Sequence, residues 1–186
     1  MTYLAGSLAV VIFLAPAQDP LAARVRQTAY ARMDLARAMA RDEAMIQFVA
    51  AKNQKAETPA EIQQHDAKWK SGGEAALRKE LQNSPCAQRL RELIKNDPFV
   101  LEAILMDRQG ANVCITHETS DYWQGDEAKW IKPVTEHQEA YVDDPAFDDS
   151  TQAYAIQMSV PVVQGGTTIG ALSLTLKVPK PATASN

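Results

Sequence analysis

Aromatic and polar side chains gather in residues 119–130, which contain two of the three tryptophans of the chain. Tyrosine and tryptophan combine an apolar ring with a polar tip, and such side chains line cavities that enclose small organic ligands or amines. The alternative, which we favour for the tryptophans, is that they anchor a short helix capped by Ser120 or Asp121. The candidate ligand-binding residues of this segment are Asp121, Tyr122, Trp123 and Trp130.

A second group of candidates lies at the start of an expected strand. It consists of Asp148, Asp149 and Ser150, with Tyr154 a little further along. A carboxylate at this place would pair with the ammonium group of a ligand or with an ordered cation. A solvated acidic loop is the alternative, and the aspartates of residues 143–149 lack the regular spacing of an EF-hand loop.

Residue patterns typical of catalysis or metal binding are missing from the sequence. His65, His117 and His137 are scattered, and there is no HExxH, GxSxG or CxxC motif. We therefore expect no catalytic residue, no metal site, no cofactor and no enzymatic activity.

The net charge of −4 is unevenly distributed along the chain. Residues 1–95 carry 14 Lys/Arg and 10 Asp/Glu, whereas residues 96–151 carry 3 and 13. Nucleic-acid binding requires a basic surface with interleaved aromatic residues, and here the aromatic segment lies in the acidic half. The charge pattern therefore argues against a DNA or RNA partner.

Cys86 and Cys114 are the two cysteines of the chain. In an oxidising compartment such a pair can form one disulfide, but the spacing does not fix whether the two Cα atoms come close enough. We favour the simpler interpretation of two small, buried, unpaired residues.

The first 17 residues predict a signal peptide. A short apolar run ends in Ala15-Pro16-Ala17, an A-x-A cleavage pattern. No Lys or Arg precedes the run, which leaves an uncleaved anchor as the alternative. No later apolar stretch reaches the ~20 residues of a membrane-spanning helix, so we expect a soluble periplasmic protein.

Residues 18–95 predict a helical segment. Residues 21–52 contain no Gly or Pro, and their apolar residues recur at helical spacing, which predicts one long amphipathic helix. Thr58 followed by Pro59 predicts the start of a second helix. A third is expected over residues 74–82, and Ser84 is expected to cap a fourth.

Residues 96–178 predict an antiparallel sheet of the same domain, followed by a disordered tail over residues 179–186. Runs rich in Val, Ile, Leu and Thr, separated by turn residues, predict strands at 99–106, 111–116, 153–163 and 168–178. A short helix near 125–131 and a short strand near 139–142 are expected between them. Apolar residues alternate with small or polar ones along 153–163, as in a strand with helices on one face and a cavity on the other.

Three blocks of the sequence resemble the Cache (PDC) class of extracytoplasmic sensor domains. They are Asp107-Arg-Gln-Gly110 followed by SDYWQGDEAKW at 120–130, Phe147-Asp-Asp-Ser150 leading to Pro161, and TTIGAL at 167–172. Together they cover roughly residues 98–178 in the order and spacing of that class, whereas the helical half matches only in layout.

The resemblance implies an α+β fold in which a long N-terminal helix and further helices pack on a five-stranded antiparallel PAS-like sheet. It also implies a small-molecule pocket between the sheet and the central insertion. Proteins of this class are mostly extracytoplasmic parts of membrane histidine kinases, chemoreceptors or cyclic-nucleotide enzymes. Because no membrane-spanning segment follows residue 178, we expect signalling through a separate membrane protein.

The expected function is that of a periplasmic sensor domain whose ligand is an amino acid, an amine or a carboxylate. A membrane histidine kinase or chemoreceptor is the expected partner, and the N-terminal helix is a candidate homodimer surface. The alternative is a structural or interaction module that binds a partner through the Ala- and Met-rich face of residues 21–51 and has no small-molecule ligand.

Overall fold

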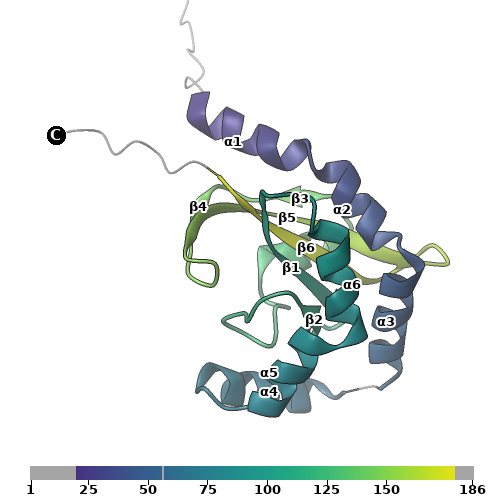
Figure 1. The fold of residues 1–186 in the computed structure, drawn as a ribbon. Helices are drawn as coiled ribbons and strands as arrows, with labels where there is room; N and C mark the ends of the chain where they lie inside the picture. Colours follow the sequence, from purple (N-terminus) through teal and green to yellow (C-terminus); the bar gives the residue numbers. More distant parts are fainter. Residues whose placement is uncertain (1–19, 56, 179–186) are drawn as a thin grey trace, which may run out of the picture.

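The computed structural model describes residues 20–55 and 57–178, so the expected signal peptide and C-terminal tail lie outside the described residues. Helices form the first half of the described chain and antiparallel strands the second (Figure 1), which confirms the predicted α+β class. Within the described ranges, no helix combines the length and the apolar character needed to cross a membrane.

The single long helix expected over residues 21–52 is instead a series of three helices. They are α1 (Pro20–Tyr30), α2 (Met33–Ala40) and α3 (Glu43–Gln54). Asp42 begins α3 because its backbone is extended and its side chain accepts hydrogen bonds from the amides of Ala44 (3.1 Å) and Met45 (3.3 Å). The apolar spacing continues across this break, with Met39 and Met45 buried in one core, so periodicity alone did not reveal it.

Of the next three helices, the first and the third begin where the capping residues predict, whereas the second begins after Glu74, whose side chain forms no capping hydrogen bond. They are α4 (Pro59–Lys70), α5 (Ala75–Asn83) and α6 (Pro85–Ile94). Thr58 and Glu61 form a reciprocal capping box at the start of α4. The Ser84 hydroxyl accepts a hydrogen bond from the amide of Ala87 (3.2 Å), which caps α6.

Replacing Thr58 with alanine is expected to lower the free energy of unfolding by about 1 kcal/mol. The Thr58 hydroxyl accepts the Glu61 amide hydrogen bond (3.2 Å), and alanine leaves that amide without its partner. Urea unfolding would measure the loss. Thr58→Ser keeps the hydroxyl and should unfold like the parent, so an equal loss in the serine variant would contradict the capping role.

The sheet is antiparallel throughout, with the order β2-β1-β6-β5-β3 and with β4 paired to β5 beside β3. Its strands are β1 (Val100–Asp107), β2 (Asn112–Ile115), β3 (Tyr141–Val142), β4 (Ala146–Asp148), β5 (Ala153–Gln164) and β6 (Thr167–Lys177). The β5–β6 hairpin turns through Gly165 and Gly166, whose positive φ angles of 58° and 81° suit glycine.

The insertion between β2 and β3 holds the short helix α7 (Ala128–Trp130) and a π-helical turn (Ile131–Thr135). The predicted helix near residues 125–131 therefore exists, but it begins later and continues as a wider turn. The insertion lies against the sheet, since α7 contacts β5 and β6.

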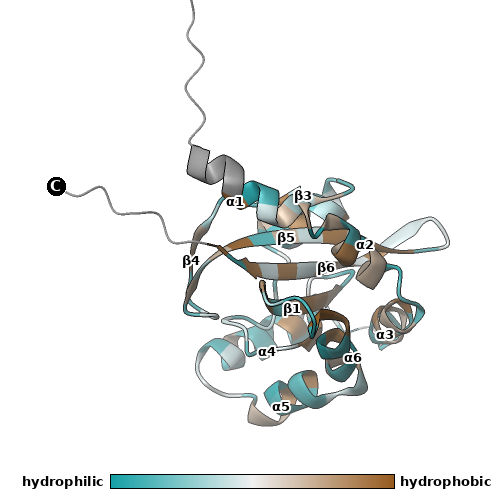
Figure 2. Ribbon diagram, turned by 45° about the horizontal axis from the view of Figure 1, so that its top comes forward, coloured by the Kyte–Doolittle hydropathy of each residue, from teal (hydrophilic) through white to brown (hydrophobic). Residues whose placement is uncertain are grey.

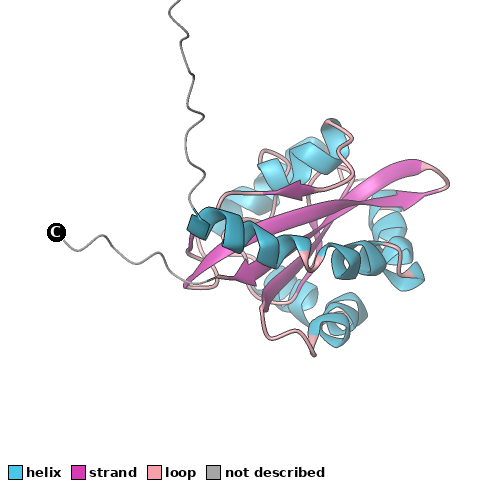
Figure 3. Ribbon diagram, turned by 90° about the horizontal axis from the view of Figure 1, so that it is seen from above, coloured by secondary structure: helices cyan, strands magenta, loops and turns pink. Residues whose placement is uncertain are grey.

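Side chains alternate between the two faces of the sheet, and β5 and β6 show this as alternating hydropathy (Figure 2). Ala103 and Leu105 of β1 pack in the core beneath α1, α2, α3 and α6. Ile104 and Met106 face the other way and join Trp69 of α4 and residues of the insertion. Helices consequently lie on both sides of the strands, as seen from above in Figure 3.

Cys86 and Cys114 form a disulfide, which corrects the interpretation of two unpaired thiols. Their Cα atoms are 5.9 Å apart, within the usual range for a disulfide. The bond joins the start of α6 to β2 and so ties the helical layer to the edge of the sheet. The sequence did not predict the pairing because it depends on how α6 lies across β2.

Candidate ligand-binding site

A cavity of about 250 Å³ lies between the sheet and the insertion, on the face opposite α1–α3. We call it the insertion cavity. The sheet contributes Glu102, Ile104 and Gln157, the insertion contributes Thr119, Ser120, Gln124, Glu127 and Lys129, and residues 147–150 close the remaining side. Its position is the one that the resemblance implies for a ligand pocket.

Strand register explains why this face of the sheet is polar. Glu102 of β1, Thr175 of β6 and Gln157 of β5 are aligned partners and form one row across the three strands. In the next row Ile104 is followed by two buried serines, Ser173 and Ser159. Small and polar side chains therefore replace the apolar packing found on the helical face.

Glu102 is the most unusual residue of the cavity, because it is a carboxylate with only 1% of its surface exposed. Its Oε2 accepts a hydrogen bond from the Thr175 hydroxyl (3.3 Å), whereas Oε1 has no hydrogen-bond partner among the described residues. Burial raises the pKa of Glu102 to about 7, an effect that Lys129 opposes, Asp148 reinforces, and the hydroxyls of Thr175 and Ser150 oppose more weakly. The charge of this side chain therefore changes near neutral pH.

Gln124 supplies a second acceptor without a donor. Its Nε2 donates to the carbonyl of Asp121 (2.8 Å), which leaves Oε1 buried without a hydrogen-bond partner in the described chain. The Gln124 amide donates to the Gly110 carbonyl (2.8 Å), and a Cβ atom at Gly110 would collide with the backbone of Gly125. The two glycines thus allow the insertion to approach the β1–β2 turn and place Gln124.

Asp148 carries a negative charge that the surrounding groups stabilise. Its Oδ1 accepts hydrogen bonds from the Ser150 hydroxyl (2.7 Å) and from the amide (2.8 Å) and hydroxyl (2.9 Å) of Thr151. Gln157 donates to Oδ2 (3.2 Å). Burial alone would raise the pKa of Asp148, but these hydrogen bonds outweigh it and hold the pKa below its ordinary value.

The cavity is acidic. Its lining includes four carboxylates, Glu102, Glu127, Asp148 and Asp149, and one lysine. Lys129 is 7% exposed and its Nζ lies 2.9 Å from Oε2 of Glu127, so its charge is already compensated. The remaining carboxylates favour a cationic group.

Three of the candidates from the sequence, Asp148, Asp149 and Ser150, line this cavity, whereas the aromatic candidates of the insertion do not. Tyr122 is completely buried, and its hydroxyl donates to Oε2 of Glu57 (2.9 Å). The indole N–H groups of Trp123 and Trp130 donate to the carbonyls of Gln109 (2.7 Å) and Asp107 (3.0 Å). The two indole contacts attach the insertion to the end of β1 and the β1–β2 turn, and the Tyr122 contact attaches it to the segment between α3 and α4.

The two other candidates also lie outside the lining of the cavity. Asp121 forms an ion pair with Lys70 (3.4 Å). The Tyr154 hydroxyl donates to the carbonyl of Pro145 (3.2 Å), and its ring packs against the helix-side core. Neither residue is free to meet a ligand in the insertion cavity.

The sequence contains a signal for Glu102, a residue that we did not select as a candidate. Glu102 interrupts the otherwise apolar run Val-Leu-Glu-Ala-Ile-Leu-Met of β1. Charged side chains are rarely buried without a partner, so an isolated carboxylate inside an apolar strand marks a position with a special role. Gln124 carried no comparable signal, because its burial depends on the approach of two glycines distant in sequence.

No family model matches the sequence, and no curated protein matches it. Solved structures that resemble the fold include the sensor domain of the Vibrio cholerae histidine kinase DctB, with 12% identity, a TM-score of 0.46, and coverage of 83% of this chain and 52% of that one. The ligand-binding domain of the Pseudomonas fluorescens chemoreceptor CtaA, in complex with L-serine, has 14% identity, a TM-score of 0.44, and coverage of 84% and 54%.

The ligand-binding domain of the Pseudomonas aeruginosa amino-acid chemoreceptor PctC, in complex with GABA, has 16% identity, a TM-score of 0.45, and coverage of 85% and 57%. The chain thus spans about half the length of these structures. Its helices packed on an antiparallel sheet form an α+β fold.

Proposed function

We propose that this chain is the small-molecule-binding domain of an extracytoplasmic sensor and that its insertion cavity binds a ligand through an ammonium group. The observation that carries the proposal is the buried Oε1 atom of Glu102, which lacks a donor. A buried polar atom without a partner costs free energy, and a charged one costs more. A ligand that donates hydrogen bonds to this atom would recover that cost.

The chemistry of the other lining residues supports the same ligand class. An ammonium group is a donor of three hydrogen bonds, and Oε1 of Gln124 is another buried acceptor on the cavity wall. Asp148 adds a negative charge. A volume of about 250 Å³ lies just below the range of drug-sized ligand sites, so the cavity suits a small amine or an amino acid.

The disulfide supports an oxidising location, because disulfides persist outside the cytosol. The proposal also includes export to the periplasm by the predicted signal peptide. It further includes signalling through a membrane histidine kinase or chemoreceptor. Dimerisation through the N-terminal helices stays a prediction.

A structural module without a ligand is less well supported. That role predicted an exposed apolar stripe along the N-terminal helices, but the apolar side chains described on α2 and α3, such as Met39, Met45 and Val49, are buried in the core. Tyr30 is the large exposed apolar residue in the described part of these helices. A scaffold also gives no reason to bury Glu102 without a donor.

A binding experiment with small amines, amino acids and carboxylic acids tests the proposal. We expect at least one amine or amino acid to raise the melting temperature of the protein and to bind in calorimetry. Glu102→Gln is expected to lower the affinity for that ligand by at least about tenfold, because a charge-assisted hydrogen bond to ammonium is lost.

Glu92→Gln is the matched control, since it removes an exposed carboxylate that pairs with Arg89 on the surface. This variant should bind like the parent. Binding of carboxylic acids alone, unchanged binding by Glu102→Gln, or no binding across the panel would each refute the proposed function.

A further inference from the structure

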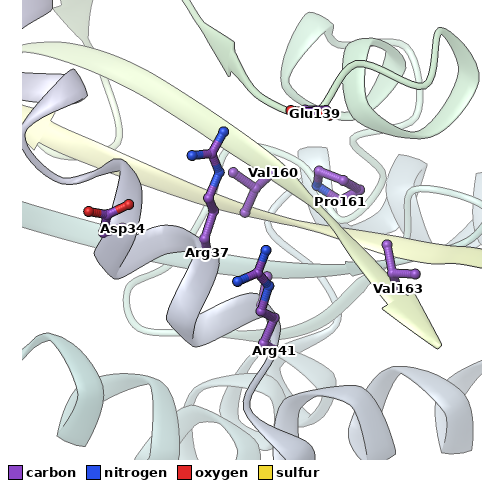
Figure 4. Close-up of a pocket in the computed structure, with 8 residues that line it drawn as sticks. Asp34, Arg37, Arg41, Glu139, Val160, Pro161 and Val163 are labelled. Carbon is purple, nitrogen blue, oxygen red and sulfur yellow. The ribbon is translucent and has the colours of Figure 1, made fainter. Parts of the chain in front are cut away.

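A second cavity lies at the edge of the sheet and shares no lining residue with the insertion cavity. It has a volume of about 500 Å³ and runs between α2 and the outer edge of β5 (Figure 4). We call it the α2–β5 groove. Arg37 and Arg41 project from one side of α2, and Val160, Pro161 and Val163 lie across from them.

The two arginines are notable because neither side chain forms a hydrogen bond or an ion pair with any described residue. Arg26 pairs with Asp144, Arg32 with Asp97, and Arg89 with Asp42, whereas Arg108 in the β1–β2 turn, like Arg37 and Arg41, forms no ion pair with a described residue. Residues four apart on a helix are neighbours, and two like charges at this spacing repel each other. An anion placed between Arg37 and Arg41 would compensate both charges.

The outer edge of β5 does not favour an added strand. β3 pairs with β5 only at Met158 and Ser159, so the edge beyond Ser159 is free of β3. The carbonyl of Gln157 accepts a hydrogen bond from Asp143 on this side, and the alternation of a strand places the backbone of Pro161 on the same side. Proline has no N–H to donate, which blocks pairing at this edge.

The groove therefore offers side chains and not backbone to a ligand. Pro161 and Val163, of which Val163 is exposed, form an apolar surface beside the two guanidinium groups, above the buried side chains of Ala40 and Val160. Such a combination suits a molecule with one anionic head and an apolar body, since guanidinium binds carboxylate oxygens in a two-pronged geometry.

Two carboxylates limit the charge that the groove accepts. Asp34 and Glu139 are part of the lining and have no ion pair with any described residue, so the four charged side chains sum to zero. A polyanion such as a nucleic acid or an acidic tail would meet repulsion from these carboxylates. A single anionic group that contacts only the arginines would not be repelled in this way.

We propose that the α2–β5 groove is a second binding site, which takes a small organic monocarboxylate. The carboxylate lies between Arg37 and Arg41, and the aliphatic or aromatic body lies on Pro161 and Val163. The site is independent of the insertion cavity and of its ammonium ligand.

Titration with hexanoate, followed by calorimetry and by amide chemical shifts, tests this site. We expect binding with a Kd on the order of 0.1–1 mM and shifts at residues of α2 and the end of β5. Hexanamide has the same shape without the charge and should not bind. The variants Arg37→Gln and Arg41→Gln should each lower the affinity for hexanoate by at least about tenfold.

Arg108→Gln is the matched control, because Arg108 is in the β1–β2 turn and lines neither cavity. It should bind hexanoate like the parent, and so should Glu102→Gln, which separates this site from the insertion cavity. Far-ultraviolet circular dichroism establishes that each variant is folded.

Three results would overturn the proposal. They are the absence of hexanoate binding, equal binding of hexanamide, and parental affinity in both arginine variants. Binding of a short peptide with a C-terminal carboxylate in the absence of hexanoate binding would also overturn it, in favour of a protein partner.

Discussion

Loss of the Cys86–Cys114 disulfide is expected to lower the free energy of unfolding by about 3 to 4 kcal/mol. The two cysteines are 28 residues apart, and the estimate is the chain entropy that a loop of this length removes from the unfolded state. For a domain of this size, that loss corresponds to a fall in melting temperature of roughly 10 °C. Urea unfolding and calorimetry, with and without a reducing agent, would measure both quantities.

The double variant Cys86→Ala, Cys114→Ala is the control for this experiment. It should match the reduced parent in stability, and the reducing agent should not change it further. Equal stability of the oxidised and reduced parent proteins would show that the bond does not constrain the unfolded chain.

Glu102→Gln is expected to stabilise the ligand-free protein above neutral pH, although the same change is expected to weaken binding of the proposed ligand. Burial raises the pKa of Glu102 from its ordinary 4.5 to about 7, so the folded state binds a proton that the unfolded state has lost. The contribution of Glu102 to stability therefore falls as the pH rises between these two values. The ionised carboxylate destabilises the fold above that window.

The variant avoids this cost, because glutamine is neutral at every pH. The expected gain in unfolding free energy is near zero below pH 4.5, grows up to about pH 7, and then stays constant at an order of 3 kcal/mol. Unfolding curves of parent and variant across this range would measure it. In Glu92→Gln, which changes an exposed carboxylate, the difference from the parent should not follow this pattern, and a flat difference in Glu102→Gln would contradict the burial argument.

The helical half was predictable from the sequence to the extent that local chemistry determines it. Thr58 and Ser84 cap helices in the structure because their side chains reach amides within the same turn. Asp42 is also a capping residue, but it stands within a continuous apolar periodicity, and we read it as part of one long helix. The bend that it makes is visible only once Met39 and Met45 are both seen in the core.

The candidate site was predictable only in part, for a related reason. The acidic strand entry around Asp148 lies where an alternating strand meets a loop, which the sequence displays. The cavity wall formed by Glu102, Thr175 and Gln157 depends on the register of three strands, and the central one is distant in sequence from β1. The aromatic residues of the insertion drew attention through their chemistry, but their indole N–H groups are used in holding the backbone.

The alternation of β1 places Glu102 and Ala103 next to each other in the chain but on opposite sides of the sheet. Glu102 faces the insertion cavity, and Ala103 packs in the helix-side core, where α3 and α6 contact β1. The layer between the insertion cavity and the helices is therefore a single strand thick. A displacement of β1 would reach the surface on which α3 and α6 pack without a relay of intermediate side chains.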